Sequence, residues 1–302
     1  MSGKSGRRPG LTIHCRVRNE EYFVRAAIES LLPAADHVLV YDTGSTDRTL
    51  DEIAAIGSPK IELVQRPAGD ARVLARYRNE MIDRTQTEWY MILDGDEIYP
   101  SLAAASIREQ LDRAPEHIHR IVVSRMHFIE NLNFVSLPDG LGRVFRTARV
   151  RQGFVCRRGG PKVGHETPYL AEAPATPWSE FSTRWPSQIF FYHCQYLRRS
   201  SKDAELGRLR GWRKPPVPVV PFFGPWPESL RTDGVARALT PALLMRCMQL
   251  NTVHAWRRLI SPGQPIPVLW RMKPWPPRDV VTFDGDDAAQ PHGDSSANGQ
   301  PS

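Results

Sequence analysis

The chain has 302 residues, a formal net charge of +7 and an isoelectric point near 9.4. With 41% hydrophobic and 24% charged residues it has the composition of an ordinary soluble globular protein, and its basic excess favours anionic partners. The scattered cysteines form no C-x-x-C pair, which argues against a disulfide framework or structural zinc site and for a cytoplasmic protein (Cys15, Cys156, Cys194 and Cys247).

Residues 1–10 are basic and polar, and we expect a disordered N-terminus without a secretory signal. Strand and helix patterns then alternate. Buried strands are predicted at 11–15, 37–41, 61–64 and 89–93, and helices at 20–32, 46–56 and 71–84. Such a series implies right-handed crossovers and an α/β fold, with a mainly parallel sheet flanked by helices.

From about residue 101 the pattern changes to a mixed half. After a helix at 102–111, strands are predicted at 120–128, 142–146 and 188–193, followed by a basic helical stretch at 198–214. Residues 215–283 are predicted to form a proline-rich linker and a helical extension, and residues 284–302 a disordered tail. The amphipathic, basic stretch at 236–260, interrupted by Pro241, fits either an acidic membrane surface or packing against the α/β domain.

Three carboxylates follow the fourth predicted strand within four residues: Asp94, Asp96 and Glu97. Ligands of open α/β folds bind at the carboxyl ends of parallel strands, and carboxylates are hard ligands for divalent cations. Gly95 lets a ligand approach the backbone closely. The segment therefore suggests a cation that binds a diphosphate, although an Asp-x-Asp triplet alone is common.

The second predicted strand ends at Asp42, and Gly44 permits a tight turn after it. Asp42 can accept a hydrogen bond from a nucleotide base or a ribose hydroxyl. The alternative is a capped strand-to-helix turn without a ligand, with Ser45 or Thr46 as the cap.

Four linked segments carry a resemblance to the family 2 glycosyltransferases of the GT-A fold: Arg18-Asn19-Glu20-Glu21, Asp42 to Thr49, Arg78-Asn79 and Leu93 to Glu97. Later segments at 143–146 and 163–166, with His193, make the chain similar to bacterial lipopolysaccharide-core-type enzymes. The resemblance covers about residues 10–214, with a nucleotide-binding half at 11–100 and an acceptor half at 101–214.

The resemblance implies a role for each matching residue. Asp42 would bind the base and Asp94 the ribose, and Asp96, the catalytic carboxylate of the triplet, would bind Mn²⁺ or Mg²⁺ with Asp94. The remaining residues implied at the nucleotide site are Asn19, Glu20, Gly44 and Arg78. A solvated surface position is the alternative for Arg78.

Two further residues have competing interpretations. Glu166 would be the general base that deprotonates the acceptor hydroxyl, or else a surface carboxylate, and Glu97 is the alternative base, although a positioning role suits it better beside the metal ligands. His193, at a strand end, would be a third metal ligand, or else a structural residue. The basic run that contains Arg198, Arg199 and Lys202 would clamp the diphosphate or form a solvated face.

The resemblance thus predicts a metal-dependent, inverting glycosyltransferase of the hexosyltransferase type. It would move a sugar from a nucleotide sugar to a glycan, lipid-linked or other hydroxyl acceptor, in cell-surface glycan synthesis. We expect a cytoplasmic protein with peripheral contact at the inner membrane face, and no nucleic-acid partner. The alternatives are a nucleotidyltransferase of similar fold, or a non-catalytic basic module that binds membrane or nucleic acid.

Overall fold

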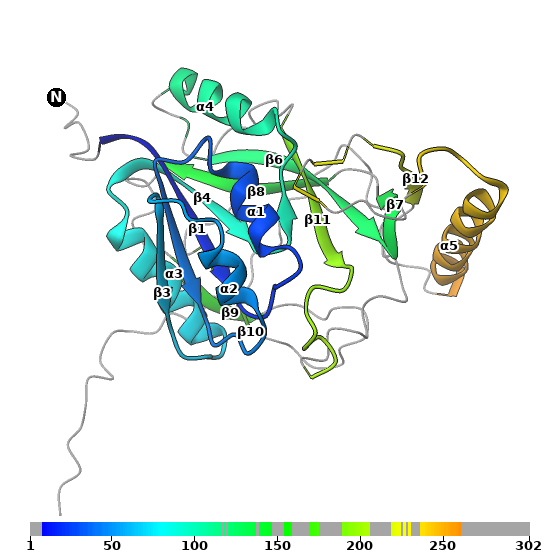
Figure 1. Cartoon of the computed structure of the whole chain (residues 1–302), viewed down its shortest axis with the longest axis horizontal. Coiled ribbons are helices and arrows are strands. Elements are labelled where there is room, and N and C mark those ends of the chain that lie inside the picture. The colour runs from blue at the N-terminus through cyan, green and yellow to red at the C-terminus, as the bar shows by residue number, and fades with distance from the viewer. Residues whose placement is uncertain are drawn as a thin grey trace, which may run out of the picture.

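The structure, a computed structural model, describes residues 8–115, 118, 120–136, 139–146, 154–158, 170–174, 189–205, 219–224, 226–227, 229–230 and 236–260. Its first half alternates strands and helices as predicted (Figure 1). In chain order these elements are β1 (Arg8–Val17), α1 (Val24–Leu31), β2 (His37–Asp42), α2 (Thr49–Ala54), β3 (Ile61–Gln65), α3 (Ala71–Arg84) and β4 (Thr87–Asp94). The predicted termini at 1–10 and 284–302 fall mostly or wholly outside the described residues.

The central sheet has a parallel half and a mixed half. Its main order is β12-β7-β6-β8-β4-β1-β2-β3, and β3, β2, β1 and β4 run parallel. β1 from Leu11 onward and β4 are almost continuously buried, as expected where helices cover both faces of a parallel sheet. This confirms the predicted α/β sheet flanked by helices.

The first residues of the helices follow from local hydrogen bonds. α3 matches its predicted range because the Asp70 carboxylate accepts the N–H groups of Arg72 and Val73, at 2.9 and 3.0 Å. α1 begins at Val24 rather than at residue 20, because residues 21–23 form a turn in which the Phe23 and Val24 N–H groups both donate to the Glu20 carbonyl. Similarly, Asp47 accepts the Thr49 N–H at 3.0 Å and sets the later start of α2.

The second half holds the mixed strands of the sheet. Its elements are β5 (Glu97–Ile98), α4 (Ala103–Arg113), β6 (Arg120–Ile129), β7 (Asn131–Ser136), β8 (Asp139–Arg146), β11 (Phe190–Tyr196) and β12 (Val219–Pro221), with a separate hairpin of β9 (Phe154–Arg158) and β10 (Leu170–Pro174). β8 joins β4 antiparallel, whereas β11 runs parallel to β6 and antiparallel to β5. β11 therefore lies beside the turn that follows β4.

The proline-rich stretch predicted as a linker is partly a sheet edge. β12 pairs antiparallel with β7, and Val219 is buried. Proline is tolerated there because an edge strand has unpaired N–H positions. Phe222 and Trp226 then pack against the main core. This part of the stretch packs on the sheet instead of separating two domains.

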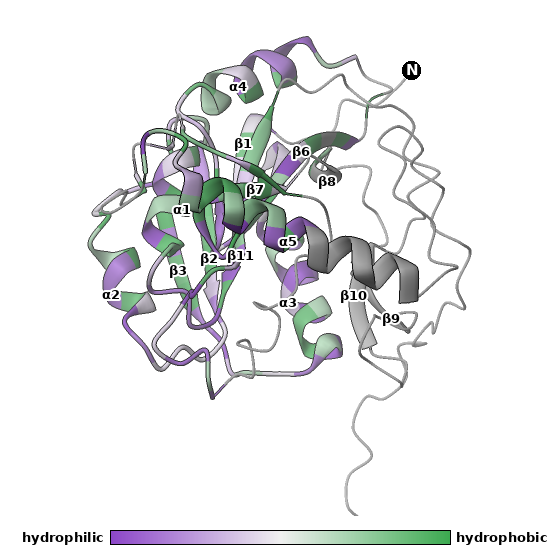
Figure 2. Cartoon of the chain, turned by 90° about the vertical axis from the view of Figure 1, so that its right-hand side faces the viewer, coloured by the Kyte–Doolittle hydropathy of each residue, from purple (hydrophilic) through white to green (hydrophobic). Residues whose placement is uncertain are grey.

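The last described helix, α5 (Pro241–Ile260), lies at the opposite end of the molecule from β3 (Figure 1). Proline begins this helix instead of interrupting it, because the first helical residue needs no N–H partner. Along its described side chains, apolar and polar residues are mixed (Figure 2). Cys247 and Leu250 pack toward β12 and β7, whereas Met248 is exposed. Among the described residues, no helix is long and apolar enough to cross a membrane.

Candidate active site

A cavity of 330 Å³ opens where β1 and β4 end side by side. Arg16 of β1 pairs in register with Asp94 of β4, so both strands deliver polar side chains to the same edge of the sheet. This is the place where open α/β folds bind ligands. The volume lies in the range of small-molecule sites.

Four of the predicted residues line this cavity together: Glu20, Asp94, Asp96 and His193. They come from the loop after β1, the turn after β4, and β11. His193 and Gln195 meet Gly95 in this lining because β11 pairs with β5, with His193 opposite Glu97.

The turn after β4 is tightly packed. The Cys194 N–H donates to the Asp96 carbonyl at 2.8 Å, and the Asp94 N–H donates to Glu97 Oε2 at 3.2 Å. A Cβ atom on Gly95 would lie 2.9 Å from both Val17 Cγ1 and Glu20 Cγ. Gly95 is therefore required by close packing, which also brings the Glu20 side chain against the turn.

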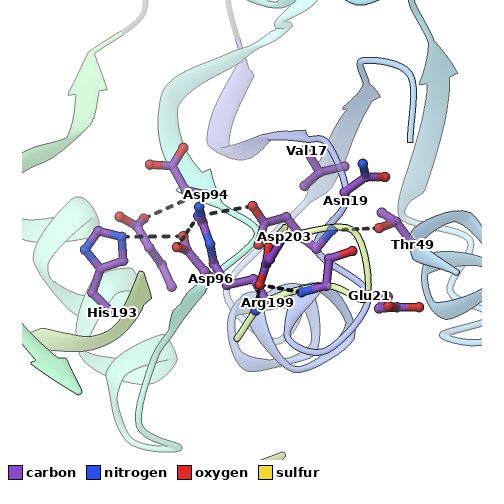
Figure 3. A network of polar contacts seen from close by, with 12 residues as sticks. Val17, Asn19, Glu21, Thr49, Asp94, Asp96, His193, Arg199 and Asp203 are labelled. Carbon is purple, nitrogen blue, oxygen red and sulfur yellow. Dashed lines mark hydrogen bonds and ion pairs between the residues drawn. The ribbon is translucent and has the colours of Figure 1, made fainter. Parts of the chain in front are cut away.

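Asp96 is buried and ionised. Its Oδ2 accepts from Arg199 Nη1 at 2.7 Å, and its Oδ1 lies 3.5 Å from His193 Nε2 (Figure 3). Burial alone would raise the pKa of this carboxyl, but the His193 and Arg199 charges and hydrogen bonds hold it well below its usual value. For Arg199, burial lowers the pKa and the charges of Asp96 and Glu20 more than restore it, so the net shift is upward.

His127 lies behind His193, with ring centroids 4.9 Å apart. Burial, with the charges of His193 and Arg125, lowers the pKa of His127 to about 3. His127 is therefore neutral near pH 7, and its ring packs against the ring of His193. It belongs to β6, and no pattern in its own segment distinguished it from a core residue.

Three predicted nucleotide-site residues instead build the loops behind the cavity. Asp42 accepts the N–H groups of Gly44 and Ser45, at 3.2 and 3.1 Å, and the Ser45 hydroxyl. Asn19, at a left-handed φ of 54°, accepts the Thr46 N–H at 2.7 Å. Gly44 also has a positive φ, 86°, as its turn requires. The structure places these three outside the described cavity lining, whereas Thr43 is part of it.

Arg78, predicted at the same crevice, is buried between α3 and the sheet and lies outside the described lining. Its Nη1 lies 3.5 Å from the His14 carbonyl oxygen. The reason is helical periodicity, because Arg78 is four residues from both Leu74 and Ile82 on the face of α3 that meets the sheet. Leu74, one turn earlier, lines the cavity.

The predicted basic helix at 198–214 begins as a turn over its described residues, 198–205. The Asp203 carboxylate causes this by accepting the N–H groups of Arg199 and Ser200. Arg199 consequently faces the cavity, whereas the neighbouring Arg198 is exposed.

Sequence reasoning missed Arg16 and Gln195, although Gln195 lies two residues after His193 on the same strand and so shares its face. The predicted base, Glu166, lies outside the described residues.

The donor set suits a hard divalent cation. Two ligands at right angles on a cation with bonds of about 2.1 Å lie about 3 Å apart, and Asp96 Oδ1 and His193 Nε2 approach that separation. Asp94 lines the same cavity. Within the described ranges, no three His, Cys, Asp or Glu side chains are already gathered as a ligand set, so binding would require small side-chain shifts.

Comparisons with known proteins agree with this picture. Residues 13–156 match the family model described as Glycosyl transferase family 2. No match was found among curated proteins.

Among solved structures, the chain is similar to S. aureus TarS 1-349 in complex with UDP, with 12% identity, a TM-score of 0.43, and coverage of 67% of this chain and 63% of that one. It is also similar to the mannosyltransferase PcManGT from Pyrobaculum calidifontis in complex with GDP-Man and Mn²⁺, with 14% identity, a TM-score of 0.43, and coverage of 67% and 61%. Glucosyl-3-phosphoglycerate synthase from Mycobacterium tuberculosis, in complex with Mn²⁺, UDP-Glc and phosphoglyceric acid, shows 25% identity, a TM-score of 0.31, and coverage of 40% and 44%.

The chain spans less than two thirds of each of these structures. The family match begins within β1, ends within β9 and includes Asp94 to Asp96. Residues 13–156 are therefore similar to glycosyl transferase family 2, as the resemblance implied.

Proposed function

We propose that the protein is a divalent-metal-dependent glycosyltransferase that moves a sugar from a nucleotide diphosphate sugar to an acceptor hydroxyl. The observation that carries this proposal is the convergence of Glu20, Asp94, Asp96, His193 and Arg199 on one cavity inside the family 2 segment. The transferred group is a hexose, with inversion at the anomeric carbon, and the product belongs to a cell-surface glycan.

The charges around the cavity support a metal. Its described lining contains three arginines, Arg16, Arg18 and Arg199, against three carboxylates, Glu20, Asp94 and Asp96. These charges balance, so a nucleoside diphosphate would bring negative charge that the described protein groups leave uncompensated. Mn²⁺ or Mg²⁺ held by Asp94, Asp96 and His193 would offset the charge that grows on the departing diphosphate.

The protein's own groups bind and orient the donor. Arg16 and Arg18 lie where β1 ends and are suited to the phosphates. Thr43 faces the cavity from the loop after β2, on which we place the base, while Asn19, Asp42 and Gly44 hold that loop in shape. Arg78, a buried residue of α3, packs this helix against the sheet and donates to the His14 carbonyl of β1.

Glu166 is the proposed general base toward the acceptor hydroxyl, on the strength of the sequence resemblance alone. Glu166→Gln should leave nucleotide-sugar binding within about twofold and reduce turnover at least 100-fold, the usual range for a lost general base. An unchanged turnover number would assign the base to another residue.

The acceptor is a glycan or lipid-linked hydroxyl, and the protein works in the cytoplasm with peripheral contact at the membrane. Support for this contact comes from α5, where Leu244, Met245 and Met248 are exposed next to one another. Co-sedimentation with vesicles containing anionic lipid should be lost in a Leu244→Asp/Met248→Asp variant. Equal co-sedimentation of the wild type and the variant would mean that α5 does not mediate the membrane contact.

The decisive experiment is a thermal-shift screen of UDP-glucose, UDP-N-acetylglucosamine and GDP-mannose, each with and without Mn²⁺. The donor that stabilises the protein is then used in transfer and hydrolysis assays, in which chelation and Asp96→Ala should abolish activity. Asp83→Ala is the matched control, because Asp83 is exposed on α3. Full activity in chelator would refute the metal role, and release of sugar 1-phosphate instead of nucleoside diphosphate would indicate a nucleotidyltransferase.

A further inference from the structure

The buried Asp96 carboxylate has a permanent positive partner within the chain. Its side chain is only 3% exposed, and Arg199 Nη1 bonds to Oδ2 at 2.7 Å and lies 3.2 Å from Glu20 Oε1. Arg199 thus joins the loop after β1 to the turn after β4 through one guanidinium nitrogen. Such charge-assisted contacts are short and strong, and the 2.7 Å contact is at the short end of this class.

Arg199 is held in this position by its own backbone. Its N–H donates to Asp203 Oδ2 at 2.7 Å, and its carbonyl accepts the Tyr22 N–H at 3.1 Å. The next residues are fixed too, because the Ser200 hydroxyl donates to Asp47 and the Ser201 N–H donates to Glu21 Oε1 at 2.6 Å. Figure 3 shows Arg199 between Asp96 and Asp203. These hydrogen bonds therefore fix the Arg199 guanidinium beside Asp96 and Glu20.

We propose that Arg199 is the counter-cation of Asp96 when no metal is bound. Arg199 holds Glu20 and Asp96 together without metal, and it competes with the divalent cation for Asp96. This inference rests on the proposed metal-binding function. Arg199 occupies the Oδ2 side of Asp96, whereas the Oδ1 side faces His193. A divalent cation binding at Oδ1 would lie within several ångströms of the guanidinium and be repelled by it.

The competition predicts that removing the Arg199 charge strengthens metal binding. Mn²⁺ alone is the probe, and its dissociation constant is measured by isothermal titration calorimetry and by electron paramagnetic resonance of free Mn²⁺. Arg199→Gln should bind Mn²⁺ at least about tenfold more tightly. The reason is that the repulsion between the guanidinium and Mn²⁺, separated by several ångströms, is strong even at an effective dielectric constant of about 20. Arg199→Lys keeps the charge and should stay within about threefold of the wild type.

Arg198→Gln is the matched control, because Arg198 is exposed and its guanidinium lies 5.8 Å from the Tyr22 ring centroid. It should not change the Mn²⁺ affinity. Asp203→Asn supplies a second route that leaves Arg199 in place. It loosens the turn that presents Arg199 to Asp96, and should tighten Mn²⁺ binding by a few fold even if Arg199→Gln does not fold.

Equal or weaker Mn²⁺ binding by Arg199→Gln would overturn the proposal, as would an absence of Mn²⁺ binding in all of these proteins. If Arg199→Gln does not fold, unchanged or weaker binding by Asp203→Asn overturns it. Binding by Arg199→Gln but not by the wild type would support the competition while contradicting metal dependence of the native enzyme. Nucleotide-sugar binding, measured by thermal shift in the same samples, reports on the proposed function separately.

Discussion

The contact between Arg199 and Asp96 makes a stability prediction that needs no substrate or metal. Arg199→Gln would leave a carboxylate with a side chain 3% exposed, whose remaining side-chain neighbour in this contact is His193, with Nε2 at 3.5 Å from Oδ1. Removing one member of a buried ion pair usually costs about 3–5 kcal/mol. We expect about 3 kcal/mol here, since Arg199 is itself 19% exposed and water can reach the gap.

The reverse substitution should cost less. In Asp96→Asn, Arg199 retains Glu20 at 3.2 Å, so about 1–2 kcal/mol is expected from the range for lost charged hydrogen bonds. The double variant should be less destabilised than the two single effects combined, by at least about 1 kcal/mol, because the unpaired charge is gone. Each 1 kcal/mol corresponds to a shift in the melting temperature of roughly 2–4 °C for a protein of about this size.

The assay is urea unfolding followed by circular dichroism at pH 7.5 in chelator, with Arg198→Gln as the control. That exposed substitution should change the free energy of unfolding by less than about 0.5 kcal/mol. Because the pKa of Asp96 is lower in the folded than in the unfolded state, its stabilisation is fully present above the unfolded value of about 4. It is lost as the pH falls through the folded value. A cost below 0.5 kcal/mol for Arg199→Gln, or additive effects in the double variant, would refute the ion pair.

Three further predictions test the core and the turn. Burial, with the charge of Arg78, lowers the pKa of His14 well below 6.5. As the pH falls below 6.5, His14 is therefore protonated in the unfolded state but not in the folded state. The free energy of unfolding should fall by up to about 1.4 kcal/mol per pH unit in this range. His14→Phe should reduce the slope in urea unfolding at pH 7.5, 6.5 and 5.5, leaving the contribution of His127, and equal slopes would contradict the assignment. Gly95→Ala should cost about 1–3 kcal/mol and weaken nucleotide-sugar binding, since its Cβ meets Val17 Cγ1 at 2.9 Å, and wild-type stability and binding would be the contrary result. Burial raises the thiol pKa of Cys15 and Cys194, so peptide mapping should find neither labelled by a thiol reagent in the folded protein, and labelling would mean that the core opens.

The first half of the fold was predictable because its information is local. Apolar strands covered on both faces and amphipathic helices repeat along the chain, and α3 begins and ends at the predicted residues 71 and 84. The mixed half was less predictable. β12 has only three residues, two of them valine, and becomes a strand because β7 offers an unpaired edge more than 80 positions earlier. Such pairing leaves no periodic signal in the proline-rich segment itself.

Topology also explains which site residues could be anticipated. Asp94 and Asp96 follow a strand of the parallel sheet, and the carboxyl ends of such strands meet at one edge. By contrast, the selection of Arg199 over Arg198 depends on a turn set by Asp203 and Tyr22, which bond to the Arg199 backbone. Nothing in the local sequence distinguishes Arg198 from Arg199, and only the conformation of the turn determines which of them faces the cavity.

The segments that carried the family resemblance combine two kinds of residue. Glu20 and Asp96 face the cavity, but Asn19 accepts a hydrogen bond from the loop after β2, and Asp42 accepts hydrogen bonds within that same loop. This loop is itself linked to Glu20, whose N–H donates to Thr49 Oγ1 at 2.8 Å. A motif read from sequence cannot separate ligand contacts from the groups that hold the contacting loop. Loss of Asn19 or Asp42 would therefore reach the ligand through the position of Glu20 and Thr43, which is why a weaker donor affinity in such variants would not by itself identify a direct contact.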